Sequence, residues 1–318
     1  MLIIPHKVTV VDVAARDGLQ SFPRWVETDV KVALIDRLSD VGFPVIEVTG
    51  FVHPRKIPNL RDAEEVLARI KRRPSTIYRA LVPNAKGAER AIRCSVPPNE
   101  ILGLIVASET YLRKNQNMST DEAVGQAIEA FRIAGRAGLS FVMAIAGSFW
   151  DLFEGRTPET KVLDLIDRFQ QAGIRRFYLA GSLGMEDPAH VSGLIHDVKA
   201  RWPSLDVGFH VHNMSGAATA NVLAALDAGA SFIEGSICGI GGGIALPNGT
   251  SATGNLASED LVYLLNETGI KTGLKTDAVV AAARDIAKML DITPVGHIAH
   301  CGSRSEMMSR ANKLSNPD

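Results

Sequence analysis

His210 and His212 stand two residues apart at the end of an apolar run that begins at Leu205. The run predicts a buried β-strand, and side chains at positions i and i+2 of a strand point to the same side. Two imidazoles that point the same way at a strand end can supply half of a metal site. The remaining ligands of such a site have to come from other strand ends.

Other polar side chains do follow predicted strands. Arg16 and Asp17 follow the first, Glu47 ends the second, and Asn255 closes the glycine-rich stretch 239–254 that follows the last. One carboxylate, two imidazoles and an amide oxygen suit a divalent ion such as Mg²⁺, Mn²⁺, Co²⁺ or Zn²⁺ that acts as a Lewis acid. No cysteine joins the set, which disfavours a structural zinc site. Arg16 could stabilise a developing oxyanion, and Glu47 could hold Arg16 or a metal-bound water.

Each of these signals has a simpler interpretation when it stands alone. Most histidine pairs on a strand are ordinary core or surface residues. Arg16 and Asp17 could form an ion pair in a turn, and Glu47 could form a plain salt bridge. Their joint placement at several strand ends favours the metal site.

The elements that must position these residues alternate along the whole chain. The predicted strands are 8–13, 45–48, 77–82, 101–106, 141–146, 176–179, 207–212 and 232–237. The predicted helices between and after them are 29–41, 62–70, 85–93, 120–137, 159–172, 188–201, 217–228 and 258–268. Near-continuous apolar strands are typical of a parallel sheet covered on both faces, and eight βα units are the number that closes a barrel.

We therefore expect an α/β fold, a (β/α)8 TIM barrel, over residues 1–275. The segment 276–318 predicts a C-terminal helical extension packed on the barrel, with helices over 278–290 and 304–312. Active sites of such barrels lie at the carboxyl ends of the strands, where the polar residues above stand.

Composition narrows the class of protein. The chain has 318 residues, 46% hydrophobic and 22% charged, with a formal net charge of −1, so no overall field recruits nucleic acid or an anionic membrane. No stretch approaches 18 consecutive apolar residues, and the first residues lack the pattern of a signal peptide. Three cysteines far apart disfavour a disulfide framework. A cytoplasmic protein with a small-molecule substrate is expected.

Several motifs together resemble one known family. They are Arg16 to Gln20, Val45-Ile46-Glu47 with Phe51-Val52 and Pro54, Ser108-Glu109 with Lys114-Asn115, and the stretch 254–263. These motifs, spread over residues 7–275, resemble the 3-hydroxy-3-methylglutaryl-CoA lyase family of metal-dependent TIM-barrel lyases and Claisen synthases. The resemblance implies an acyl-CoA or related 3-hydroxy acid substrate, a homodimer, and a divalent metal, with Mg²⁺ or Mn²⁺ as the first choice.

The resemblance also implies roles for individual residues. Its metal ligands would be Asp17, His210, His212 and Asn255. Arg16 would polarise the substrate carbonyl or stabilise the enolate, and Lys114 and Asn115 would contribute to a CoA pocket. We expect Arg16, Glu47 and His53 to carry catalysis. His53, Glu109 and Ser182 are the three candidates for a catalytic acid or base that replaces the one used by the family.

Two positions depart from the family. The lyases carry a cysteine in a Gly-Gly-Cys-Pro context, where this chain has Gly243, and an aspartate in a Leu-Gly-Asp-Thr context, where it has Gly181. Cys238 lies five residues before Gly243 and is interpreted as a packing residue. We expect the two glycines to make room for a larger or differently charged acyl group.

Three functions remain open at this stage. The first is a metal-dependent carbon–carbon lyase that cleaves a 3-hydroxyacyl-CoA of the 3-hydroxy-3-methylglutaryl-CoA type, with an altered substrate. The second is an aldolase or Claisen-type synthase acting on a 2-oxo acid, which Asn213 after the second histidine favours and Leu19 disfavours. The third is a non-catalytic homologue that binds metal and ligand, which the missing cysteine favours.

Overall fold

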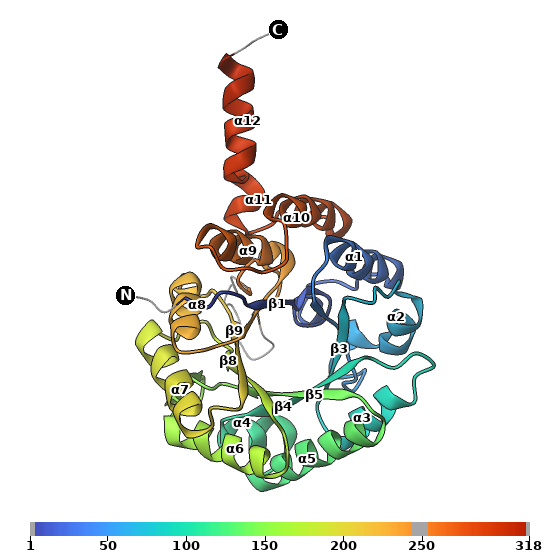
Figure 1. Cartoon of the computed structure of the whole chain (residues 1–318). Coiled ribbons are helices and arrows are strands. Elements are labelled where there is room, and N and C mark those ends of the chain that lie inside the picture. The colour runs from blue at the N-terminus through green and yellow to red at the C-terminus, as the bar shows by residue number, and fades with distance from the viewer. Residues whose placement is uncertain (1–3, 243–253, 316–318) are drawn as a thin grey trace.

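The computed structural model describes residues 4–242 and 254–315, and in these ranges eight parallel strands close into a barrel (Figure 1). The strands of the barrel are β1 (Thr9–Asp12), β2 (Val45–Gly50), β3 (Ile77–Val82), β4 (Glu100–Val106), β5 (Ser140–Ala146), β8 (Arg176–Gly181), β9 (Asp206–Val211) and β10 (Phe232–Gly235). Each strand pairs with those before and after it, and β1 pairs with β10 to complete the ring. The predicted (β/α)8 barrel is confirmed.

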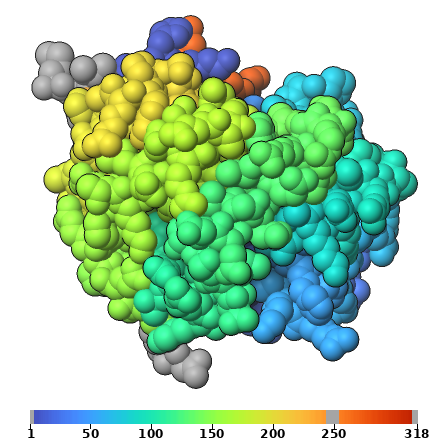
Figure 2. Space-filling view, turned by 90° about the horizontal axis from the view of Figure 1, so that it is seen from below, coloured from blue at the N-terminus to red at the C-terminus, as the bar shows by residue number. Residues whose placement is uncertain are grey.

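Helices follow the strands and form the outer layer. They are α1 (Thr28–Val41), α2 (Ala63–Arg69), α3 (Ala85–Ile92), α5 (Thr120–Arg136), α6 (Glu159–Gln171), α7 (Pro188–Arg201), α8 (Ala218–Asp227) and α9 (Ser258–Glu267). Figure 2 shows one side of the barrel, where the helices coloured from cyan to yellow cover the surface without a break. This layer hides the outer face of the strands from water, which is why the strands read as apolar runs.

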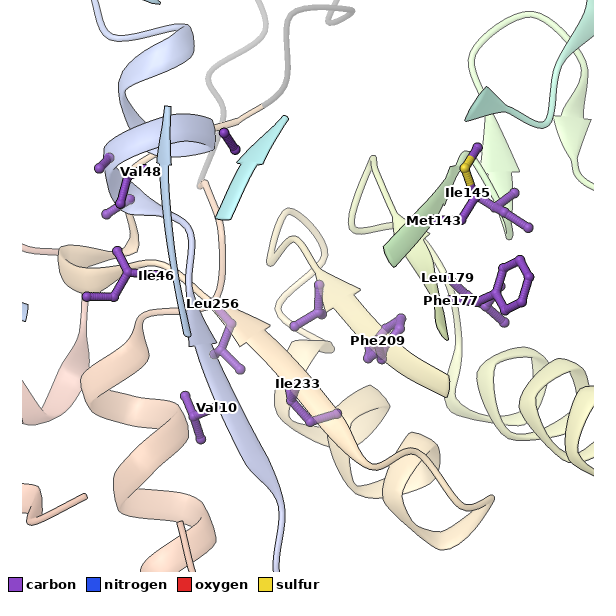
Figure 3. Packing of buried hydrophobic residues seen from close by; sticks show 14 of the residues in the cluster. Val10, Ile46, Val48, Met143, Ile145, Phe177, Leu179, Phe209, Ile233 and Leu256 are labelled. Atoms are coloured by element: carbon purple, nitrogen blue, oxygen red, sulfur yellow. The ribbon is translucent and has the colours of Figure 1, made fainter. Parts of the chain in front are cut away.

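The strands present two different faces. Outward-facing side chains pack with the helices in one large cluster, and Figure 3 shows Val10, Ile46, Phe177 and Phe209 among them. The alternate positions point into the barrel and form a smaller cluster that includes Val11, Leu102 and Tyr178. The period of two along each strand therefore decides which residues can reach the barrel interior and its carboxyl end.

The C-terminal segment has two parts. Helix α10 (Thr276–Leu290) packs against α1 and α9, with seven of its residues buried. Helix α12 (Arg304–Ser315) projects away from the barrel, and α11 (His297–Cys301) joins the two (Figure 1). The domain boundary at 275/276 stays a prediction. In the described part of the chain, no helix has the length and apolar character to cross a membrane.

Short elements at the carboxyl end of the barrel have no counterpart in the prediction. They are the π-helical turns η1 (Ala14–Gly18) and η3 (Leu112–Gln116), the short helix α4 (Glu109–Tyr111), the 3-10 turns η2 (Pro58–Leu60) and η4 (Ile237–Gly239), and the hairpin of β6 (Trp150–Asp151) and β7 (Gly155–Arg156). Each has five residues or fewer, too short to show a hydrophobic period. Strand β10 ends at Gly235, two residues earlier than predicted, and η4 begins at Ile237.

Candidate active site

A cavity of about 260 Å³ opens at the carboxyl ends of the barrel strands. One side of it, the polar wall, consists of Arg16, Asp17, His210 and His212. Apolar residues of the barrel strands that line the cavity, here called the apolar wall, are Leu81, Leu104, Val106, Ala144, Ala146 and Ala180. Further polar residues of the lining are Gln20, Tyr111, Gln116, Asp151, Tyr178 and Ser182. The position agrees with that expected for a TIM-barrel active site, and the cavity brings the predicted ligands from β1 and β9 together.

Asp17, His210 and His212 form a compact, buried cluster. One ligand atom from each lies within 4.8 Å of the others, and the Nε2 of His212 is 3.6 Å from the Oδ2 of Asp17. The turn η1 places Asp17, because the backbone amides of Arg16, Asp17 and Gly18 all donate to the carbonyl of Val13. Single π-helical turns of this kind are frequent at functional sites. The cluster offers one carboxylate and two imidazoles to a divalent ion.

Glu234 on β10 orients His210. The Nδ1 of His210 lies 3.0 Å from the Oε2 of Glu234, and the Oε1 of the same glutamate accepts a hydrogen bond from Arg79 at 2.6 Å. Glu234 is fully buried, so water does not screen its electrostatic contact with His210. A carboxylate on Nδ1 fixes the tautomer of a histidine and directs Nε2 toward a metal. The site therefore includes an orienting residue for one of its ligands.

Asn255 joins the cluster from the segment that follows the glycine-rich loop. It forms an isolated antiparallel bridge with His212, and its Nδ2 donates to the Oδ2 of Asp17 at 2.8 Å. Its buried Oδ1 has no hydrogen-bond partner among the described residues. Buried polar atoms without partners are rare, and a carbonyl oxygen next to the cluster can ligate a cation. The donor set therefore fits a divalent metal.

The glycine-rich loop approaches this cluster closely. Gly241 has φ +126, and a Cβ atom there would lie 2.3 Å from the Nδ2 of Asn255. A Cβ at Gly18 would lie 2.6 Å from a side-chain carbon of Ile240. Glycine is needed at 241 for both its backbone conformation and its small size, and at 18 for its size alone.

Arg16 and Glu47 form a buried ion pair beside the cluster. The guanidinium donates to Glu47 at 2.5 Å and 3.2 Å, and to Asp17 at 2.7 Å. Glu47 is fully buried on β2, next to a register shift between Glu47 and Thr49. Bulges of this kind re-aim side chains near active sites. Of the two sequence interpretations of Glu47, the contacts support the one in which it holds Arg16.

The electrostatics of Asp17 and His212 favour the ionised and neutral forms that ligate metals, whereas those of His210 favour its protonated form. Burial would raise the pKa of Asp17, but Arg16 and the two histidines outweigh it and hold the pKa well below its usual range. Burial lowers the pKa of His212, which favours the neutral imidazole that ligates metals. Burial would also lower the pKa of His210, but the hydrogen bond to Glu234 and the Asp17 charge raise it.

Tyr178 reaches the cavity from β8. Its ring stacks on the ring of His210 with centroids 6.1 Å apart, and its buried hydroxyl has no hydrogen-bond partner among the described residues. Burial and the nearby charges of Glu234 and Glu47 raise the pKa of Tyr178 well above its usual value. The hydroxyl therefore keeps its proton and can donate it in a hydrogen bond to a bound molecule.

Of the other predicted residues, Ser182 lines the cavity, where its Oγ accepts a hydrogen bond from the amide of Gly147 at 3.0 Å, whereas Glu109 is exposed and does not line it. His53 is exposed, does not line the cavity, and accepts a hydrogen bond from the backbone amide of Arg55. Lys114 and Asn115 are exposed on η3, where Lys114 lies 4.5 Å from the centre of the Phe153 ring. The geometry gives these three residues no contact with the cluster, and the roles expected for them stay predictions.

The expectation that Gly181 opens space for substrate is wrong. A Cβ atom at Gly181 would lie 2.0 Å from the Oε1 of Glu186, so the Glu186 carboxyl fills the space beside the glycine. Both oxygens of this buried carboxyl lack hydrogen-bond partners among the described residues, and burial raises the pKa of Glu186 to about 7. Sequence spacing could not show that a residue five positions later folds back onto β8. Gly243, the second departure, lies outside the described residues.

Cys238 agrees with its interpretation as a packing residue. It is buried in η4, and its Sγ lies 3.2 Å from the carbonyl oxygen of Ala283 in α10. Burial raises the pKa of its thiol. A thiol that is buried against a helix and protonated is not a reactive nucleophile.

Three residues of the site were missed from the sequence. Glu234 and Arg79 stand inside predicted strands, and Tyr178 stands in the strand 176–179. A charged residue within an otherwise apolar strand is itself a signal, because a buried charge needs a partner. That signal could have identified Glu234 and Arg79, whereas Tyr178 has the ordinary appearance of a core aromatic residue.

The fold and the cluster together define a TIM-barrel enzyme with a candidate metal centre. The chain belongs to the HMGL-like family, whose model matches residues 7–286, and it is a lyase. This finding argues against the non-catalytic alternative.

Similar proteins support this assignment. The chain is 36% identical to the hydroxymethylglutaryl-CoA lyase YngG of Bacillus subtilis, over 90% of this chain and 94% of that one. It is 34% identical to the human mitochondrial hydroxymethylglutaryl-CoA lyase, over 91% and 87% of the two chains. The structure of an HMG-CoA lyase from Acinetobacter baumannii, in complex with coenzyme A and 3-methylmalate, superposes with a TM-score of 0.87 at 34% identity, covering 95% and 97%.

Proposed function

We propose that this lyase cleaves the bond between C2 and C3 of a 3-hydroxyacyl-CoA of the 3-hydroxy-3-methylglutaryl-CoA type, with the help of a divalent metal. The observation that carries the proposal is the buried cluster of Asp17, His210 and His212 with the unpartnered Oδ1 of Asn255 beside it. Similar chains named hydroxymethylglutaryl-CoA lyases support the substrate class.

Asp17, His210, His212 and Asn255 would hold the metal, with Mg²⁺ or Mn²⁺ as the first choice and Co²⁺ or Zn²⁺ as alternatives. When bound, such an ion supplies Lewis-acid chemistry that lowers the pKa of a substrate hydroxyl and polarises an adjacent carbonyl. Glu234 keeps the Nδ1 of His210 occupied, so that the Nε2 stays directed toward the cluster.

The cleavage transfers a proton and shifts two electron pairs. The C3 hydroxyl gives its proton to a base, the O–H electron pair forms the C3=O double bond, and the pair of the breaking C2–C3 bond passes to C2 as a thioester enolate. The enolate then takes up a proton, so the reaction has no net gain or loss of protons. The products are acetyl-CoA and a carbonyl compound, and no oxidant or reductant is needed. Arg16 keeps its positive charge beside the thioester oxygen because Glu47 and Asp17 hold it in place.

Tyr178 supplies a second hydrogen-bond donor to the same reaction. Tyr178 lines the cavity, and its protonated, buried hydroxyl has no hydrogen-bond partner among the described residues. A donor that is already oriented and dehydrated stabilises an oxyanion without reorganisation during the reaction. Arg16 and Tyr178 would together stabilise the negative charge of the enolate.

The test is an assay of the purified full chain for acetyl-CoA release. 3-Hydroxy-3-methylglutaryl-CoA and 3-hydroxyacyl-CoAs with other C3 substituents are each incubated with Mn²⁺ or Mg²⁺ and with EDTA. We expect release that requires the metal for at least one of these esters. Absence of release from all of them would refute the proposal, and condensation of acetyl-CoA with a 2-oxo acid would support the synthase alternative instead. Dimerisation and a cytoplasmic location stay predictions.

A further inference from the structure

Arg79 is a buried cation to which neither the cavity nor the cluster assigns a role. It lies on β3, its side chain is fully buried, and it does not line the cavity. Its guanidinium lies inside the barrel, 5.9 Å from the centre of the Tyr178 ring. A cation in this position has lost its hydration, so its partners must compensate for that loss.

The guanidinium bridges two glutamates from different strands. Its Nε donates to the Oε2 of Glu100 at 2.7 Å, and its Nη1 donates to the Oε1 of Glu234 at 2.6 Å. Each glutamate uses its second oxygen for another partner. Glu100 accepts a hydrogen bond from Arg176 at the amino end of β8, and the Oε2 of Glu234 lies 3.0 Å from the Nδ1 of His210. One carboxylate therefore joins Arg79 to a predicted metal ligand.

The direction of the Glu234 carboxyl depends on this bridge. Strands β3 and β10 are not neighbours, because β1 and β2 lie between them in the barrel, so the hydrogen bond from Arg79 crosses the barrel interior. A glutamate side chain has three rotatable bonds, and the last of them has a broad preference, so the backbone of β10 alone does not fix the carboxyl. The guanidinium is itself held by Glu100, and its planar donors hold the Oε1 of Glu234 in one place.

Stability alone explains this bridge poorly. Buried ion pairs are often no more stabilising than hydrocarbon side chains of similar volume. Arg79 also has an unsatisfied donor, because its buried Nη2 has no hydrogen-bond partner among the described residues. Such a donor costs free energy on folding. A bridge with these costs is explained if it fixes the direction of the ligand at its end, since the partners of a metal-binding histidine control its orientation.

We propose that Arg79 is a positioning residue of the metal cluster, which acts through Glu234 to hold the imidazole of His210 with its Nε2 directed toward the cluster. Arg79 takes no part in bond breaking or proton transfer. The orientation of the ring stands independently of the proposed function, whereas its effect on metal affinity rests on that function.

Two replacements of Arg79 test the inference. The double variant Arg79→Met/Glu100→Gln removes one positive and one negative charge, so the net charge of the barrel interior is kept, and Glu100→Gln is its reference. Arg79→Lys keeps the charge, but one ammonium nitrogen replaces the separate donors to Glu100 and Glu234. If the double variant does not fold, Arg79→Lys, compared with the wild type, carries the same test.

The tautomer of His210 reports the orientation without metal. A carboxylate at Nδ1 keeps the proton on that nitrogen when the ring is neutral. Nitrogen NMR spectra of the full chain in EDTA distinguish the two tautomers, with the pH raised until the ring is neutral, and His210→Gln identifies the signals. We expect the Nδ1–H tautomer almost alone in the wild type and in Glu100→Gln, and a mixture of both tautomers once Arg79 is replaced. An unchanged tautomer would overturn the inference.

Calorimetric titration with Mn²⁺ measures the consequence for the cluster. We expect the Kd for Mn²⁺ to rise at least about threefold when Arg79 is replaced, less than the roughly 10- to 100-fold typical of a partner bound directly to a ligand. In a Glu234→Gln background the same replacement should cause no further loss, because effects that pass through one residue are not additive. A further loss of equal size would show that Arg79 does not act through Glu234 and would overturn the inference.

Arg176→Lys is the matched control. The hydrogen bonds of Arg176 go to Glu100 and Asp206, so the same substitution there should leave the tautomer of His210 and the affinity for Mn²⁺ unchanged. Losses equal to those of Arg79→Lys would assign the effect to Glu100 and contradict the inference.

Failure of the proposed function has a different signature. A wild type that binds no Mn²⁺, or that binds it and cleaves no ester, contradicts the proposed function, and the tautomer alone then decides the inference. Normal Mn²⁺ binding and cleavage by the wild type, with the tautomer and the Mn²⁺ affinity unchanged when Arg79 is replaced, supports the reaction and overturns the inference.

Discussion

The polar and apolar walls of the cavity belong to one barrel, and Ala180 of the apolar wall even pairs with His210, yet the two walls are stabilised in different ways. In the polar wall and behind it, charged groups hold one another: Glu47 holds Arg16, and Glu234 joins His210 to Arg79. In the apolar wall, Leu81 and Ala144 belong to the hydrophobic cluster inside the barrel, and no charged group holds them in place. The polar wall can tolerate few changes, because each charge depends on its partner, whereas the apolar wall can change volume without leaving a charge unpaired. This difference separates the chemistry of the site from its substrate preference.

Loss of a metal ligand should have the largest effect. Asp17→Asn removes the one carboxylate of the cluster, and a Lewis acid contributes several kcal/mol, so turnover should fall by about a thousandfold or more. Turnover and Mn²⁺-dependent thermal stabilisation are measured together. Asp164→Asn, on the exposed side of α6, is the control. Unchanged Mn²⁺ stabilisation in Asp17→Asn would exclude Asp17 as a ligand.

Removal of the Tyr178 hydroxyl should have the second-largest effect on turnover. Tyr178→Phe keeps the ring on His210 but deletes the donor, and turnover should fall by about a hundredfold, as for loss of one oxyanion donor. Metal affinity and KM should change little, because the hydroxyl acts on developing charge. Tyr78→Phe is the control, since the Tyr78 hydroxyl donates to Ser39 outside the barrel. A change in KM without a change in kcat would instead assign Tyr178 to substrate binding.

Loss of the Glu234 carboxylate, which orients His210, should have a smaller effect. Glu234→Gln should weaken metal affinity by about 10- to 100-fold, the usual cost of losing a partner that orients a ligand. Titration with Mn²⁺ measures this loss. Glu100→Gln is a close control, because Glu100 also pairs with Arg79 but has no hydrogen bond to His210. Equal losses in both variants would show that Arg79, rather than the orientation of His210, is responsible.

Glu186, whose carboxyl lies beside Gly181 at the end of β8, should affect stability rather than turnover. Burial raises its pKa from 4.5 to about 7, so the folded state holds a proton that the unfolded state releases between these values. The folded protein therefore loses stability as pH rises from about 4.5 to 7, by up to about 3 kcal/mol from this group.

The variant Glu186→Gln should remove this loss. Its free energy of unfolding relative to the wild type should increase between pH 5 and pH 8, as measured by urea denaturation at both values. Glu89→Gln, a substitution at an exposed glutamate of α3 that pairs with Arg93, should show no such pH-dependent difference. A constant difference between Glu186→Gln and the wild type across this range would show that Glu186 is ionised in the folded protein.

The ligand set was readable from the sequence because its members lie in or after the carboxyl ends of strands. His210 lies in β9, His212 follows it directly, and Asp17 lies in η1, five residues after β1. The parallel barrel brings all these carboxyl ends to one rim. His53 and Lys114 stand on connecting segments whose direction is set by side-chain contacts such as that between Lys114 and Phe153. Hydrophobic periodicity does not encode such contacts. The sequence therefore could not predict whether His53 and Lys114 reach the cavity.

The sequence by itself determined the barrel, the order of its elements and the convergence of Asp17, His210, His212 and Asn255. These follow from hydrophobic periods and from the topology of parallel strands, which are properties of the chain taken in order. Only the tertiary structure decided that Glu186 fills the space beside Gly181, that Glu234 orients His210, and that one wall of the cavity is hydrocarbon. Those facts depend on which side chains meet across the barrel, and packing at distances of a few ångströms sets them.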